Sequence, residues 1–193
     1  MLPVSRRLQI WIGVGLSGLL IVTRGYHFAT LDLLPSASYA VFFLAGVYLT
    51  PRWVFPALWS VAALVDLSAI TVGGVSAFCV SPAYVFLIPA YGALWLAGRQ
   101  WGATHRWTWP RVPFLAASLL IGAVVCELLA SGGFYFFSGR FPHPTIAGFG
   151  PRLATYFPLS LESLLFYVGA AAVIHIATVV TSTVRRHQTA RVK

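Results

Sequence analysis

Residues 112–137 read VPFLAASLLIGAVVCELLASGGFYFF, and this stretch decides the fold class of the chain. It contains a single charged side chain, Glu127. A hydrocarbon core about 30 Å thick is crossed by a helix of about 20 mostly apolar residues. The stretch is therefore long enough and apolar enough to be a membrane-spanning helix.

The rest of the chain has the same character. Hydrophobic residues make up 59% of the 193 positions and charged residues 9%, and the mean hydropathy is +0.82. These values are typical of an integral membrane protein. We predict six transmembrane helices, at residues 8–28, 36–50, 53–71, 82–98, 112–137 and 153–181.

The connections between these segments are short. The longest are residues 99–111 and 138–152, which leaves no length for a soluble domain. We therefore expect residues 1–193 to form one all-α transmembrane domain. The second and fourth segments are short enough to cross with little tilt or to reach only part of the way across the bilayer.

Basic residues predict the orientation. With a cytoplasmic N-terminus, ten of the 13 lysines and arginines fall on the cytoplasmic side, and Arg24, Arg140 and Arg152 fall near the outer face. This asymmetry follows the positive-inside rule, so both termini are expected in the cytoplasm. The net charge of +9 is then a result of topology and of contact with the inner leaflet. A nucleic-acid partner is not expected, because no soluble module carries a basic stripe with exposed aromatics.

Several polar residues are predicted at a similar depth near the outer face. They are His27, Asp66, Cys79, Tyr84 and Arg152. An interfacial histidine or tyrosine is usually an anchor, and an arginine at a helix start can extend its head group to the surface. Asp66 differs, because a carboxylate in a membrane helix costs about 2.5–3.5 kcal/mol on insertion scales and usually has a partner or a function.

The two cysteines have different settings. Cys126 lies inside the apolar segment 112–137, where a thiol usually behaves as a small hydrophobe. Cys79 lies in the polar turn GGVSAFCVSP, residues 73–82, where Arg152 or a helix N-terminus would stabilise a thiolate. A disulfide or an unreactive thiol is the alternative for Cys79.

A thiolate is a soft ligand suited to a transition metal. The chain has no C-x-x-C, H-x-x-x-H or H-E-x-x-H pattern, so a zinc site is not expected. A metal carried in a macrocycle needs only an axial ligand from the protein, which points to a corrinoid or a haem. A bis-histidine haem is disfavoured, because His27 and His175 are predicted in opposite halves of the membrane.

The small size, the six predicted helices and the ordered set of outer polar residues resemble the BtuM family of bacterial vitamin B12 (cobalamin) transporters. That family is related to the S-components of energy-coupling-factor (ECF) transporters. The resemblance spans essentially the whole chain. It implies an S-component-like bundle in the bacterial inner membrane that binds a corrinoid at its outer face for uptake.

The resemblance also implies roles for single residues. Cys79 is implied as the axial ligand of the corrinoid cobalt. An accessory ligand exchange that removes cyanide from cyanocobalamin would follow, in a protein that is a transporter rather than an enzyme. Asp66 and Arg152 would set the ionisation of Cys79 and orient the corrin, and His27 and Tyr84 would contribute hydrogen bonds or proton transfer.

The source of energy is constrained by lysine usage. Lys193 is the only lysine, so the chain contains no Walker A loop. It would need an ECF-type ATPase module, use another gradient, or only bind and release its substrate. Two other classes stay open: an ion-coupled carrier of another small molecule that uses Asp66, Glu127 and Glu162, and a membrane sensor or assembly protein. Glu127 and Glu162 could also bond each other, Arg24 or backbone groups.

Overall fold

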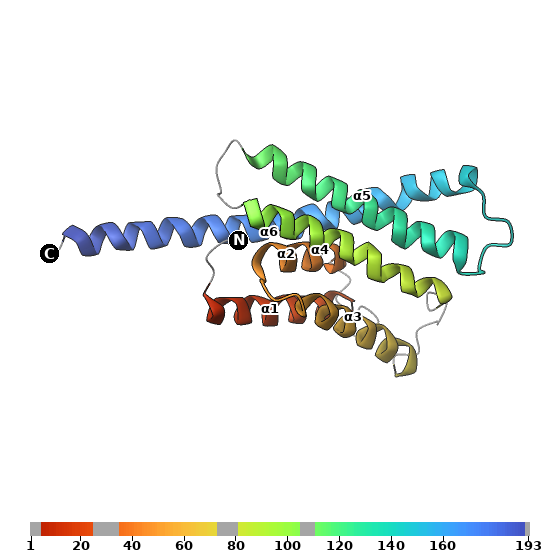
Figure 1. Cartoon of the computed structure of the whole chain (residues 1–193), viewed down its shortest axis with the longest axis horizontal. Helices are drawn as coiled ribbons and strands as arrows, with labels where there is room; N and C mark the ends of the chain where they lie inside the picture. Colours follow the sequence, from red (N-terminus) through yellow and green to blue (C-terminus); the bar gives the residue numbers. More distant parts are fainter. Residues whose placement is uncertain (1–4, 25–34, 73–80, 105–110, 192–193) are drawn as a thin grey trace.

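The computed structural model describes residues 5–24, 35–72, 81–104 and 111–191, apart from the side chains of residues 104, 180 and 182–191. Within these ranges all regular elements are helical (Figure 1). In chain order they are α1 (Arg6–Arg24), α2 (Ser38–Tyr48), α3 (Val54–Thr71), the short 3-10 helix η2 (Pro82–Phe86), α4 (Leu87–Thr104), α5 (Val112–Phe137) and α6 (Ile146–Arg191).

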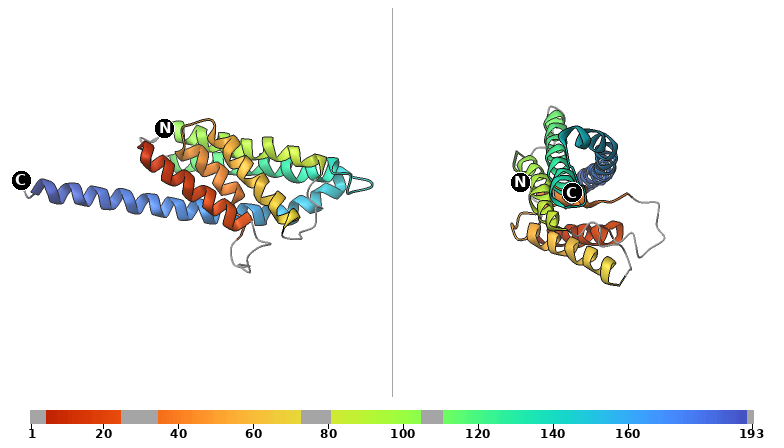
Figure 2. Two further views of the ribbon diagram at one scale, coloured as in Figure 1. Left: turned by 90° about the horizontal axis from the view of Figure 1, so that it is seen from below. Right: turned by 90° about the vertical axis from the view of Figure 1, so that its right-hand side faces the viewer.

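The helices alternate in direction. In Figure 1, α1, α3 and α5 run toward the right-hand end of the bundle, and α4 and α6 run back from it. We call this end, which holds Phe137 and Ile146, the α5–α6 end. Helix α6 has 46 residues, about 69 Å at 1.5 Å per residue, and its C-terminal part projects beyond the other helices (Figure 2).

Helix α2 is the centre of the bundle. Nine of its 11 residues are buried, and it packs against α1, α3, α4 and α6. Phe42 is fully buried and stacks on the Tyr91 ring of α4 with the ring centres 4.4 Å apart. A helix that is apolar on every side can be surrounded by other helices, and the sequence of α2 fits that position.

Glycines bring the backbones of α2 and α4 close together. A Cβ added at Gly46 would lie 2.1 Å from the Trp95 carbonyl oxygen, and one at Gly98 would lie 2.0 Å from the Phe43 carbonyl oxygen. Gly102 is one turn from Gly98 and approaches α2 in the same way. Small residues at this spacing are a common contact surface between membrane helices, where close packing replaces the hydrophobic effect.

Three helices are long and apolar enough to cross a membrane by length and composition: α3, α5 and the Ile146–Val179 part of α6. Helix α2 is apolar but has only 11 residues, about 16 Å, roughly half of the hydrocarbon core. The described parts of the chain are therefore those of an all-helical membrane protein. The shortness of the second segment agrees with the prediction.

The predicted boundaries agree best in the middle of the chain. Helix α5 coincides with the predicted 112–137, and α3 begins one residue later than predicted. Helix α1 begins two residues before the predicted 8–28, whose last four positions lie outside the described residues. Helix α2 is shorter by two residues at each end.

The fourth segment continues past the predicted end at 98. It begins as η2 and continues as α4 to Thr104, so the predicted connection 99–111 is partly helical. The prediction placed the boundary before the charged Arg99. This side chain stays within the helix because its Nη2 donates a hydrogen bond to the Thr50 carbonyl oxygen, 2.9 Å away, just beyond α2.

The predicted last helix, 153–181, was wrong at both ends, because α6 runs from Ile146 to Arg191. Thr145 caps its start: the Thr145 Oγ1 accepts the Gly148 N–H at 3.1 Å, and its carbonyl accepts the Phe149 N–H at 3.0 Å. Such a cap satisfies donors that the first turn leaves unpaired. Pro151 is then accommodated inside the helix, where it removes a single N–H donor.

Candidate functional site

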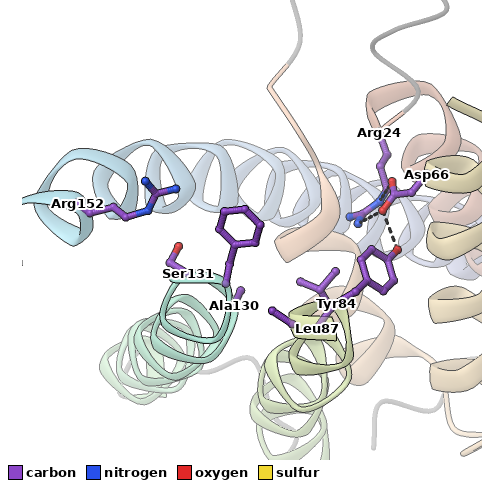
Figure 3. A pocket seen from close by; sticks show the side chains of 9 residues that line it. Arg24, Asp66, Tyr84, Leu87, Ala130, Ser131 and Arg152 are labelled. Atoms are coloured by element: carbon purple, nitrogen blue, oxygen red, sulfur yellow. Dashed lines mark hydrogen bonds and ion pairs between the residues drawn. The ribbon is translucent and has the colours of Figure 1, made fainter. Parts of the chain in front are cut away.

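A cavity of about 280 Å³ lies among α1, α3, η2, α4, α5 and α6 (Figure 3). Its walls combine apolar and polar side chains. They are Arg24, Asp66, Ala83, Tyr84, Leu87, Ala130, Ser131, Phe134 and Arg152. Three of the five predicted site residues, Asp66, Tyr84 and Arg152, are thus brought together from three separate elements.

Asp66 is held at one side of the cavity by a two-point ion pair with Arg24. The Arg24 Nε lies 2.7 Å from the Asp66 Oδ1, and the Arg24 Nη2 lies 2.7 Å from the Oδ2. The Tyr84 hydroxyl also donates to the Oδ2 at 2.7 Å. The guanidinium cancels the charge of the carboxylate, and the two-point geometry fixes its orientation.

Arg24 is itself fixed by residues of two further helices. Its Nη1 donates to the Ser38 hydroxyl of α2 at 2.9 Å and to the Tyr91 hydroxyl of α4 at 2.7 Å. Tyr91 is buried, with 4% of its surface exposed. The position of Asp66 therefore depends on α1, α2, α4 and η2 as well as on its own helix, α3.

Arg24 was not predicted as the partner of Asp66. Both residues were predicted near the outer face, but Arg24 was considered only as a partner for Glu127 or Glu162. Among the described residues, the ion pair is instead with Asp66. The available signal was depth alone, because Arg24 is the last residue of α1 and Asp66 lies in the last two turns of α3.

Arg152 lies across the cavity from Asp66, on α6 (Figure 3). Its guanidinium carbon is 4.9 Å from the centre of the Tyr156 ring, 5.1 Å from that of Phe141 and 6.0 Å from that of Phe134. Aromatic rings within about 6 Å attract such a cation. The Nε is buried and has no hydrogen-bond partner among the described residues.

Glu127 is a second buried acid next to the cavity. It is 2% exposed, and its Oε2 accepts a hydrogen bond from the Tyr39 hydroxyl of α2 at 2.8 Å. Its Oε1 accepts one from the Ser131 hydroxyl, and Ser131 also lines the cavity. Glu162 is exposed on α6, and the described contacts of Glu127 do not include it.

The remaining predicted site residues, His27 and Cys79, lie outside the described residues. In the sequence, His27 follows Arg24 by three positions, and Cys79 precedes Ser81 by two and Tyr84 by five. His27 is therefore close in sequence to the cavity residue Arg24, and Cys79 is close to the cavity residue Tyr84. Cys126 is a fully buried free thiol in α5.

The described residues contain no group of three or more histidine, cysteine, aspartate or glutamate side chains that could hold a metal ion. The cavity is lined by a carboxylate held by Arg24, a phenol, the arginine Arg152 and apolar side chains. No protein-family model matches the chain, and no curated protein matches it.

Proposed function

We propose that this protein takes up a corrinoid, vitamin B12 or a relative, across the bacterial inner membrane. The observation that carries the proposal is the convergence of Asp66, Tyr84 and Arg152 on one cavity. These are three of the five residues that the resemblance to the BtuM family implies as the corrinoid site. Under this proposal α1, α2 and α4 count as membrane helices with α3, α5 and α6, in an S-component-like bundle.

The walls of the cavity suit part of such a ligand. A corrinoid presents amide side chains around an apolar ring, and Leu87 and Phe134 supply apolar surface beside the polar groups of Arg152 and Tyr84. Ligand sites generally combine apolar walls with a few placed polar groups. A pocket for a drug-sized molecule has about 300–1,000 Å³, so a corrinoid would extend beyond the 280 Å³ that the described residues enclose.

In the proposed chemistry, the Cys79 thiolate becomes an axial ligand of cobalt. A cobalt–sulfur bond forms, the cobalt–cyanide bond breaks, and cyanide leaves with its electron pair, so the oxidation state of cobalt does not change. Arg152 would favour the thiolate by its charge. Asp66 would act by orienting Tyr84 and Arg24, because the bonds to these residues occupy both of its oxygens.

The proposed orientation puts the cavity at the outer face and both termini in the cytoplasm, following the positive-inside rule. Lys193 is the only lysine, so the sequence contains no Walker A loop. The energy for transport would therefore come from a source other than ATP hydrolysis at such a loop. An ECF-type ATPase module is one proposed partner, and an ion gradient is the other.

The test is the visible spectrum of detergent-purified protein after incubation with cyanocobalamin and removal of free vitamin. We expect the unaltered protein to retain the vitamin with a shifted spectrum, because sulfur replaces an axial ligand of cobalt. Cys79→Ala should lose the shift. Cys126→Ala is the matched control, since it removes the buried thiol of α5 and should keep the shift.

Two outcomes would count against the corrinoid site. Colourless protein in all samples would exclude cyanocobalamin as a ligand. A shift that persists in Cys79→Ala would exclude the cobalt–thiolate bond.

A second candidate is an ion-coupled carrier of another small molecule. The buried Glu127 favours it, because Ser131 joins this acid to the cavity wall. Asp66 is already neutralised by Arg24, and Glu162 is exposed. Of the three acids proposed to carry the coupling ion, Glu127 therefore remains. Transport by such a carrier should survive Cys79→Ala and fail in Glu127→Ala.

A further inference from the structure

Glu127 is a buried acid with no basic partner among the described residues. It lies in the middle of α5, the most apolar of the three candidate spans. A carboxylate without a counter-charge is costly at such a position, and a membrane-buried acid often exchanges a proton. Its two oxygens contact hydroxyl groups, which can act as donors or acceptors.

The groups around Glu127 come from several helices. Tyr39 reaches it from α2, and Ser131 lies one turn away on α5. Cys126 is its buried neighbour in sequence. From α4, Tyr91 touches the Tyr39 ring with the ring centres 6.4 Å apart. The two arginines of the cavity have other contacts: Arg24 pairs with Asp66, and Arg152 lies against aromatic rings of α5, α6 and the connection between them.

Ser131 joins Glu127 to the cavity, because its hydroxyl bonds the acid and the residue lines the wall. When Glu127 is ionised, Ser131 gives its only hydrogen to the carboxylate. When Glu127 is protonated, the acid can donate to the Ser131 oxygen, and the serine hydrogen becomes free to turn toward the cavity. The proton on Glu127 therefore decides whether this wall offers a donor to a ligand.

We propose that Glu127 is a proton-binding site coupled to the cavity through Ser131, and that a ligand oxygen bound at Ser131 draws one proton onto Glu127. The proton comes from water and stays on the carboxyl group while the ligand is bound. Binding and protonation then favour each other by the same free energy. The coupling to a corrinoid rests on the proposed function, whereas the proton site does not.

The first experiment needs no ligand. Infrared difference spectra of the full chain in lipid are recorded between high and low pH. We expect the carboxylic-acid band that appears at low pH to lose a component in Glu127→Gln and to shift in Ser131→Ala. Glu162→Gln is the matched control, because it removes an exposed glutamate and should leave that component in place. An unchanged band in Glu127→Gln would overturn the proton site.

The second experiment adds cyanocobalamin and counts the protons exchanged on binding, from the binding heats in buffers of different ionisation enthalpy. Ionisation of a cysteine thiol would release a proton in every variant, so the informative quantity is the difference between proteins. At a pH at which the infrared spectra show Glu127 ionised without ligand, we expect the unaltered protein to take up one proton more than Glu127→Gln. The Glu127→Gln variant should still bind cyanocobalamin, because the glutamine amide can donate a hydrogen bond to Ser131 as the protonated acid does.

The outcomes separate the two proposals. Equal proton counts with retained vitamin would overturn the coupling and leave corrinoid binding in place. No retained vitamin in either protein would overturn the corrinoid function, and the infrared component lost in Glu127→Gln would still support the proton site.

Discussion

The ion pair of Arg24 and Asp66 shows why a charged residue is tolerated in this bundle. The side chains are 14% and 24% exposed, and every oxygen of the carboxylate has a donor. Both residues were predicted near the outer face from the sequence. Their pairing was not, because they are 42 positions apart and belong to helices whose rotation about their axes only packing determines.

The first prediction concerns this pair. Arg24→Gln should destabilise the protein by about 3 kcal/mol, near the lower end of the range for breaking a buried pair, because it leaves Asp66 charged and unpartnered. Adding Asp66→Asn should recover part of that loss. The measurement is the thermal unfolding midpoint in detergent of both single variants and the double variant.

Arg52→Gln is the control, because Arg52 is exposed and should tolerate the change. Losses that simply add in the double variant would mean that the two side chains do not stabilise each other.

At the scale of elements, the backbones of α2 and α4 approach closely at Gly46, Gly98 and Gly102. The sequence predicted both helices but not this close approach. The approach depends on Gly46 of one helix facing Trp95 of the other, a relation that hydropathy does not report. The shortness and the all-round apolar surface of α2 are explained only by the bundle, where neighbouring helices surround it.

Gly98→Ala tests this contact. The new methyl group would overlap the Phe43 carbonyl oxygen, 2.0 Å from the ideal Cβ position, so the two helices must separate. Overpacking usually costs about 1–3 kcal/mol, and occasionally more, and we expect a lower unfolding midpoint and less folded protein in size-exclusion chromatography. Gly15→Ala in α1 is the matched control.

Apart from the local backbone of α1, no atom of the described residues lies within 4 Å of a Cβ at Gly15. Alanine favours a helix by about 1 kcal/mol over glycine. That variant should therefore be as stable as the unaltered protein or more so. Equal midpoints for the two variants would contradict the close approach of α2 and α4.

At the scale of the whole molecule, the cavity lies where the last parts of α1, α3 and α5 meet η2 and the first parts of α4 and α6. The last part of α6 projects beyond the other end of the bundle. The proposed topology places that projection in the cytoplasm. Four of the ten predicted cytoplasmic basic residues lie in it or just beyond it, at Arg185, Arg186, Arg191 and Lys193.

Reporter fusions after Lys193 test this topology. We expect a fused green fluorescent protein to fluoresce and a fused alkaline phosphatase to be inactive, as for a cytoplasmic C-terminus. Replacing Arg185, Arg186, Arg191 and Lys193 by glutamine should weaken that preference, because basic residues near a span bias its orientation. An active phosphatase fusion on the unaltered chain would reverse the topology and place the cavity at the cytoplasmic face.

The sequence by itself determined the class of protein and the approximate helix positions. These properties are local, because a segment of about 20 apolar residues has the length of the hydrocarbon core whatever surrounds it. Two of its errors fell where a tertiary contact or a cap extends a helix, at Arg99 and at Thr145.

The tertiary structure alone decided which residues meet. It paired Arg24 with Asp66, and it brought Tyr39 to Glu127 across 88 positions of the chain. It also gathered Asp66, Tyr84 and Arg152 around one cavity. The physical reason is that hydropathy fixes the position of a helix along the membrane normal, whereas its neighbours and its rotation are set by close packing between helices.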